Sequence, residues 1–180
     1  MGHVPVADQQ TSVAEAPREL RDVMRHFATG VCVVSTYAQR DGEREHDAIT
    51  VNSLTSVSLD PPLISLSFRS DSGFLATLME TQVWGVSILD AGSEQTARLF
   101  ARPKHERDLT LRTLPTQTGA STGALLFEAS GWMECRYRDH VIAGDHVMVI
   151  GEVLGMGVHD SPAPLIFLQG GFHRFEPQPR

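Results

Sequence analysis

The feature that most constrains the fold is a succession of β-branched and apolar stretches separated by short turn signals. These stretches cover residues 31–37, 48–58, 63–68, 83–89, 125–138, 146–158 and 165–175. Asp41-Gly42 is typical of a tight hairpin, and Gly144-Asp145 is a second turn signal. Strands that meet through turns rather than crossover helices favour a largely antiparallel sheet. The pattern therefore predicts a mainly β protein, a β-barrel with a few short helices, because closure leaves no open edges.

Three short helices are expected between these strands. They are predicted to begin beside Pro17, to cover residues 72–80, and to run from Ser93 to about residue 101. The polar residues 102–122 are expected to form a loop. In the last predicted strand, Gly170-Gly171 indicates a bulge.

Length and composition indicate one ordinary globular domain. The chain has 180 residues, of which 41% are hydrophobic and 21% charged. We expect a flexible leader at residues 1–16, which are polar and aperiodic, and a single domain at 17–180. No apolar run approaches the roughly 20 residues of a membrane helix, and no signal peptide is visible. A cytoplasmic protein with no membrane partner is expected.

Charge and cysteine content exclude further classes of protein. Acidic residues (22) exceed Lys and Arg (15), giving a net charge of -7, which argues against a nucleic-acid partner. Cys32 and Cys135 show no C-x-x-C spacing and are expected to be free buried thiols. The histidines show no metal-binding spacing, so no metal is expected.

Small polar side chains alternate with apolar ones in the second strand-like stretch. A strand here would present Thr50, Asn52 and Ser53 along one wall. Such a wall suits a flat heteroaromatic ligand, whose ring edges need hydrogen-bond partners. From composition alone, however, Ser and Thr on the solvent face of a half-buried strand is the favoured interpretation.

An ordered set of motifs makes this stretch specific. The run Ala48-Ile-Thr-Val-Asn-Ser-Leu-Thr-Ser-Val-Ser-Leu-Asp-Pro-Pro-Leu63 is followed in order by Gly85-Val-Ser-Ile-Leu89, Ala143-Gly-Asp-His146 and Gly171-Phe-His-Arg-Phe175. Together they resemble the flavin reductase-like family over about residues 20–176. The resemblance implies an FMN-binding split barrel of Greek-key type.

The resemblance also implies roles for particular residues. The flavin would be lined by four consecutive residues, Thr50, Val51, Asn52 and Ser53. The ribityl phosphate would lie near Ser67, Arg69 and Ser70, with Lys104 as a further candidate. His146 would be the catalytic residue in the sense of receiving and orienting the nicotinamide, and Asp145 would orient its ring.

Alternatives exist for each charged residue. Arg69 and Lys104 are also compatible with solvated surface charges, and Gly144-Asp145-His146 with a simple turn. Ala48, Val51 and Leu54 stand where the family commonly has glycine, alanine and phenylalanine, which reshapes the wall. The sequence therefore leaves FMN and FAD both open.

The function that the resemblance implies is NAD(P)H-dependent reduction of FMN or FAD. NADH or NADPH would donate the hydride, and reduced flavin would diffuse to a partner flavin-dependent monooxygenase. The sequence has no G-x-G-x-x-G motif, so the nicotinamide would stack on the flavin. The alternatives are a flavin-binding module without fast turnover and an oxidase of the pyridoxamine-phosphate type. A homodimer is expected, because a shallow wall on a small barrel buries a ligand poorly.

Overall fold

The computed structural model describes residues 16–159 and 163–175. The helices are α1 (Ala16–Met24), α2 (Gly73–Thr81), α3 (Glu94–Phe100) and α4 (Lys104–Leu111). The strands are β1 (Thr29–Gly30), β2 (Cys32–Arg40), β3 (Glu43–Val51), β4 (Thr55–Leu59), β5 (Pro62–Arg69), β6 (Val83–Ile88), β7 (Thr116–Thr118), β8 (Leu125–Phe127), β9 (Gly131–Ala143), β10 (His146–Val158), β11 (Leu165–Leu168) and β12 (Gly171–Arg174). The predicted leader lies outside the described residues except for Ala16, which begins α1.

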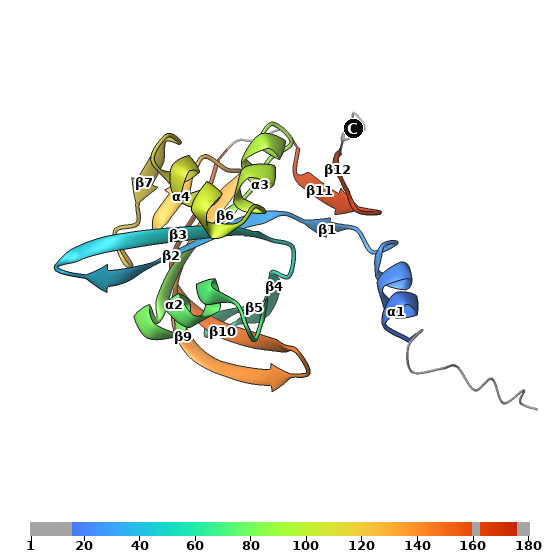
Figure 1. Cartoon of the computed structure of the whole chain (residues 1–180), viewed down its shortest axis with the longest axis horizontal. Coiled ribbons are helices and arrows are strands. Elements are labelled where there is room, and N and C mark those ends of the chain that lie inside the picture. Colours follow the sequence, from blue (N-terminus) through green and yellow to red (C-terminus); the bar gives the residue numbers. More distant parts are fainter. Residues whose placement is uncertain (1–15, 160–162, 176–180) are drawn as a thin grey trace, which may run out of the picture.

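The architecture is one seven-stranded sheet with two small accessory sheets (Figure 1). The strand order in the large sheet is β3-β2-β6-β9-β10-β5-β4, and each of its pairings in the described chain is antiparallel. The prediction of a mainly β, largely antiparallel barrel is confirmed. Strands β11 and β12 pair with each other and, through β11, with β1, while β7 pairs with β8.

The two edges of the large sheet are consecutive in the chain. Strand β3 ends at Val51 and β4 begins at Thr55, at opposite ends of the strand order. Four Cα steps span at most about 14 Å, so the sheet must curl until its edges approach each other (Figure 1). We call this opening between β3 and β4 the seam of the barrel.

Three predicted strands are wrong in their extent. The expected strand at 48–58 is two strands, broken at residues 52–54 where the chain crosses the seam. The expected strand at 125–138 is also two, β8 and β9, which belong to different sheets. The last stretch is the hairpin β11–β12, because Gln169 and Gly170 both take positive φ and form its turn rather than a bulge.

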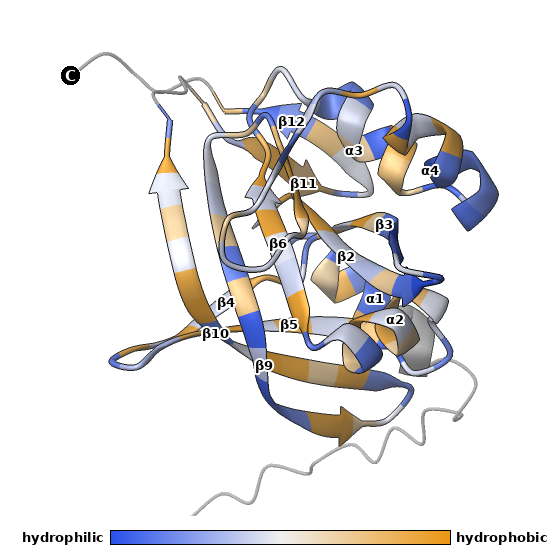
Figure 2. Ribbon diagram, turned by 90° about the vertical axis from the view of Figure 1, so that its left-hand side faces the viewer, coloured by the Kyte–Doolittle hydropathy of each residue, from blue (hydrophilic) through white to orange (hydrophobic). Residues whose placement is uncertain are grey.

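The predicted loop at 102–122 is wrong, because it contains α4 and β7. Helix α4 is held on β3 by an ion pair between Arg107 and Asp47, whose side chains are 12% and 4% exposed. The guanidinium makes three hydrogen bonds of 3.0–3.2 Å to the carboxylate. Helices α3 and α4 lie together beside β3 and β2 (Figure 2).

The core consists of two clusters on opposite faces of β2. Cys32 and Val34 belong to the cluster inside the barrel, which α2 covers with three buried side chains, while Val31 and Val33 belong to the cluster beneath α3. This explains why β2 reads as a nearly continuous apolar run. Along β9, hydrophobic and hydrophilic segments alternate (Figure 2).

The expected helices at 72–80 and 93–101 are confirmed as α2 and α3, although only the first has a side-chain cap. The Ser72 hydroxyl accepts the Leu75 N–H, whereas the Ser93 hydroxyl donates to Asp90 at 2.8 Å instead. Helix α1 is also confirmed. Its predicted apolar face is exposed, however, at Leu20 (65%), Val23 (68%) and Met24 (51%).

Both cysteines are free and buried, as predicted. Burial raises the pKa of the Cys32 thiol to about 12. The pKa of Cys135 is also raised to about 12, by burial first and by the neighbouring Glu134 carboxylate second. Neither thiol is a nucleophile near neutral pH.

Candidate functional site

A pocket of about 480 Å³ lies at the seam, between the end of β3 and the strands β5 and β10. Its lining includes seven of the ten residues that the sequence analysis selected, namely Thr50, Val51, Asn52, Ser53, Ser67, Arg69 and His146. The seam explains how they meet. Residues 50–53 leave one edge of the sheet, and β5 and β10 return beside the other edge.

Two hydroxyls at the pocket wall are already used by the protein. The Ser53 hydroxyl donates to the Ser67 carbonyl at 3.1 Å and accepts the Ser67 N–H at 3.0 Å, which ties the seam segment to β5. The Thr50 hydroxyl donates to the Ala97 carbonyl at 2.6 Å and ties β3 to α3. These side chains therefore fix the shape of the wall, and each oxygen retains capacity to accept a further hydrogen bond.

His146 and Arg69 are cross-strand partners of β10 and β5 at one end of the pocket. The His146 imidazole Nδ1 lies 2.8 Å from a carboxylate oxygen of Asp145. This hydrogen bond lowers the pKa of Asp145 below its ordinary value. Asp145 does not line the pocket, but it holds the ring that does. The Ser70 N–H donates to the Asp145 carbonyl at 2.9 Å, so Ser70 closes the turn through its backbone.

The Arg69 guanidinium is clamped by a neighbouring carboxylate. Its Nε and Nη2 donate to the two oxygens of Asp71 at 2.9 and 2.8 Å. The Arg69 hydrogen bond is the largest cause that lowers the pKa of Asp71. Asp71 and Asp145 thus bring two carboxylates to the end of the pocket where a phosphate was expected to meet Arg69.

The structure does not bring Lys104 to this pocket. Lys104 is the first residue of α4, and its ammonium lies 2.9 Å from Asp108 and 3.7 Å from Glu45. Both carboxylates, one on β3 and one on α4, are partly exposed to solvent. The position of Lys104 agrees with the alternative interpretation of a solvated, paired surface charge.

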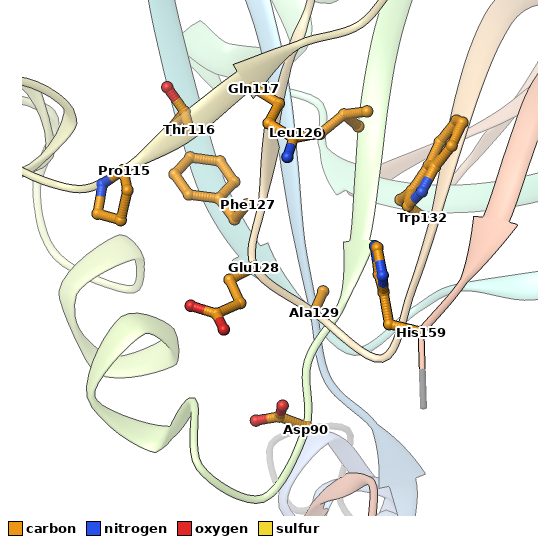
Figure 3. A pocket seen from close by; sticks show the side chains of 10 residues that line it. All are labelled: Asp90, Pro115, Thr116, Gln117, Leu126, Phe127, Glu128, Ala129, Trp132 and His159. Carbon is orange, nitrogen blue, oxygen red and sulfur yellow. The ribbon is translucent and has the colours of Figure 1, made fainter. Parts of the chain in front are cut away.

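A larger cavity of about 620 Å³ lies elsewhere, between β7–β8 and the start of α3 (Figure 3). Asp90 and Glu128 carry carboxylates on one side, and Trp132 and His159 lie together on the other (Figure 3). None of the candidate residues lines it. Seven candidate residues line the pocket at the seam, so that pocket is the better candidate despite its smaller volume.

Sequence reasoning missed Asp71 and Ser72, which line the same pocket. The signal was present in the run Arg69-Ser-Asp-Ser72, where an acid two residues after an arginine can fold back onto it. Within residues 20–159 and 163–175, no group of three His, Cys, Asp or Glu side chains is arranged to hold a metal. No helix in the described part of the chain is both long and apolar enough to cross a membrane.

Comparison with known proteins defines the class to which this barrel and pocket belong. The model of the "Flavin reductase like domain" matches residues 24–176. The chain is 34% identical over 163 residues to an NADH-dependent FAD reductase of Streptomyces globisporus, covering 88% of this chain and 86% of that protein. It is 33% identical over 137 residues to a probable flavin reductase of Rhizobium meliloti, covering 76% of this chain but 42% of the longer relative.

Solved structures agree with this assignment. BorF, the flavin reductase component of a bacterial two-component tryptophan halogenase, superimposes with a TM-score of 0.80 at 37% identity, covering 90% of this chain and 99% of BorF. The flavin reductase of styrene monooxygenase from Pseudomonas putida S12 gives a TM-score of 0.74 at 29% identity, covering 89% and 99%. The chain therefore belongs to the flavin reductase-like family, as the motifs predicted, and its fold is the split barrel of that family.

Proposed function

We propose that this protein is an NADH-dependent flavin reductase. The observation that carries the proposal is the convergence of Thr50, Asn52, Ser53 and His146 on one open pocket at the seam. Membership of the flavin reductase-like family supports it, as does the Streptomyces relative, which is named as an NADH-dependent FAD reductase.

The residues present fit a flavin. The pocket volume of about 480 Å³ lies within the range of roughly 300–1,000 Å³ for small-molecule sites. Asn52 is exposed in the seam, where its amide can donate to and accept from the polar edge of the ring. Ser53 and Ser67 hold the wall in place beside it.

Bound flavin supplies the ring that accepts a hydride, and the chain contributes position rather than reactive groups. His146 is the proposed receptor for the nicotinamide, because it lines the pocket next to the flavin wall and is about half exposed (45%). Asp145 orients the imidazole through Nδ1, which leaves Nε2 available to a ligand.

Reduced flavin is the proposed product, released to a flavin-dependent monooxygenase. The styrene monooxygenase and tryptophan halogenase components named above are reductases that serve a separate oxygenating or halogenating enzyme. A pocket open to solvent suits a ligand that leaves after each turnover. The two alternatives, a flavin-binding module and a pyridoxamine-phosphate-type oxidase, lack an observation of this kind.

The proposed active form is a homodimer. The β9–β10 hairpin exposes Val141 (50%) and Met148 (39%). These residues are cross-strand partners on the same face of the sheet as His146. Exposed apolar side chains that lie together mark an interaction surface, and a second copy seated on this pair would cover it and deepen the pocket at the same time. Sedimentation should show a dimer at micromolar concentration, which V141E weakens and L109E, on α4, does not; a monomeric wild type contradicts the proposal.

Two further predictions concern location and extent. We propose a cytoplasmic location, supported by two cysteines that remain separate buried thiols. The division into a leader at residues 1–16 and one domain at 17–180 also stays a proposal.

One assay tests the activity. Oxidation of NADH and NADPH is followed at 340 nm with added FMN, FAD or riboflavin. Turnover with NADH and at least one flavin is the expected result. Absence of turnover with every pair would reject the reductase, while tight flavin binding without turnover would favour the binding module.

A further inference from the structure

The seam pocket contains one guanidinium, and an acid of the same pocket occupies it. Among the described residues that line the pocket, Arg69 alone carries a permanent positive charge and Asp71 alone a carboxylate. Nε and Nη2 of Arg69 donate to the two carboxylate oxygens of Asp71, so one whole edge of the guanidinium fork is used. The described lining of the pocket therefore carries no net permanent charge.

A short turn after β5 holds these two side chains together. The Ser72 N–H donates to the Arg69 carbonyl at 3.0 Å and closes the turn. The Ser70 N–H donates to the Asp145 carbonyl at 2.9 Å and fastens the turn to the start of β10. Because the backbone is fixed at both points, Asp71 lies within reach of Arg69 before any ligand arrives, and little conformational entropy is lost when the pair forms.

Other donors near the guanidinium are already bound within the chain. The backbone N–H groups of Ser67, Ser70 and Ser72 all donate to acceptors of the protein. An anion at this end of the pocket therefore depends on Arg69 for its strongest hydrogen bonds. The fork edge of the guanidinium becomes available to that anion only when Asp71 leaves it.

We propose that Asp71 competes with the phosphate of a flavin for Arg69, and that this competition sets the affinity for phosphorylated flavins. In the free protein Asp71 occupies the guanidinium. When FMN or FAD binds, the phosphate takes its place and Asp71 turns to solvent, to which its side chain is already 68% exposed. The inference rests on the proposed function, since it takes the ligand of the seam pocket to be a flavin.

Competition of this kind acts on phosphorylated flavins and spares riboflavin. FMN exchanges one ion pair for another, whereas riboflavin has no phosphate and leaves the pair between Arg69 and Asp71 intact. Both side chains are more than half exposed, so solvent and salt screen the pair and its effect amounts to a few fold. A modest loss of affinity suits a reductase whose product has to leave, because most differences in affinity appear in the dissociation rate.

The experiment compares D71N with the control D108N, which removes an ion-paired carboxylate of α4 that does not line the pocket. Dissociation constants for FMN, FAD and riboflavin are measured by calorimetry on the full chain at low and high salt. R69Q and R69Q/D71N complete a double-mutant cycle. Circular dichroism checks the fold of each protein, and oxidation of NADH with FMN is followed in parallel.

D71N should bind FMN about fivefold more tightly at low salt, and FAD should change in the same direction. Riboflavin binding to D71N, and FMN binding to D108N, should change by less than about twofold. The gain for FMN should shrink at high salt. In the R69Q background D71N should give less than about a twofold gain, because no guanidinium remains to be released.

Three results would overturn the proposal. The first is an unchanged or weaker affinity of D71N for FMN. The second is an equal gain for riboflavin, which would show that the charge acts on the ring rather than on the phosphate. The third is a full gain in the R69Q background, which would show simple repulsion between two negative charges instead of competition for Arg69.

The same measurements separate this proposal from the proposed function. Turnover of NADH without an effect of D71N on FMN binding rejects the competition and keeps the reductase. The expected pattern of binding in a protein that does not oxidise NADH rejects the reductase and keeps the competition. A wild-type protein that binds neither FMN nor riboflavin rejects both.

Discussion

Replacement of Asp47, on β3, by alanine should lower the free energy of unfolding. The loss should exceed that caused by substituting an exposed residue of α4. The Asp47 side chain is 4% exposed and accepts three hydrogen bonds from Arg107, as well as the Ala48 N–H at 2.8 Å. In D47A the guanidinium keeps the Arg102 carbonyl at 2.8 Å as its described partner. Breaking a buried pair by removing one partner costs about 3–5 kcal/mol, and we expect about 3 kcal/mol because Arg107 is 12% exposed.

Urea unfolding at fixed protein concentration, followed by tryptophan fluorescence, measures this loss. A loss of 3 kcal/mol corresponds to a fall in Tm of roughly 6–12 °C for a domain of this size. The double variant D47L/R107M removes both charges and keeps apolar volume, so it should recover most of the stability. A loss below about 1 kcal/mol in D47A, or a double variant less stable than D47A, would refute the view that an uncompensated buried charge causes the effect.

Three further predictions follow from packing, burial and the pocket. Gly151→Ala should lower the free energy of unfolding in urea by about 1–3 kcal/mol, because a Cβ there would overlap the ring of the fully buried Trp84. Gly73→Ala is the control, because a Cβ at residue 73 meets open space. Both buried thiols should resist alkylation at pH 8 in the native protein and react in urea. Since their pKa is raised to about 12, the contribution of the thiols to stability should be constant below about pH 9 and should fall above it, as the thiols of the unfolded chain ionise. His146→Ala should raise the KM for NADH more than the KM for flavin, and a change in the flavin KM alone would place His146 elsewhere.

Local sequence signals correctly predicted the helices and strands whose residue pattern is regular along the chain. The fold class, the β2–β3 hairpin and α2 follow from β-branched runs, from Asp41-Gly42 with its two positive φ angles, and from the Ser72 cap. The alternation of apolar residues changes phase between Val51 and Leu54, which indicates a bent strand. It does not indicate that one strand ends here and another begins at the opposite edge of the sheet. The cause of this break is the closure of the sheet, which joins strands that no local pattern relates.

Helix α4 was missed for a different reason. Its sequence has few apolar residues, so hydrophobic periodicity is weak. It carries the i, i+4 pair Lys104–Asp108, and Arg102, just before the helix, pairs with Glu106. Charge spacing could have found this helix. The ion pair between Arg107 and Asp47 is separated by 60 residues, and only the tertiary fold brings it together.

For the candidate site, the sequence motif correctly located the residues of one pocket wall. It did not predict which charged side chains surround that wall. Thr50, Asn52 and Ser53 are adjacent in sequence, so their grouping needed no tertiary information. The clamp of Arg69 by Asp71 depends on how the chain turns after β5. A smaller pocket is lined by residues of α1, by Asn52 and by the β11–β12 turn, three segments that are far apart in the sequence.

Because the pocket lies on the seam, the affinity for a ligand is coupled to the separation of the two edges of the sheet. Its walls come from the two edges of one sheet, joined by residues 52–54 and by the two hydrogen bonds between Ser53 and Ser67. A ligand that touches both walls bridges the edges, and by thermodynamic linkage it must favour the closed barrel by as much as closure favours the ligand. The three residues 52–54 therefore contribute both to the integrity of the fold and to the affinity of the pocket for its ligand.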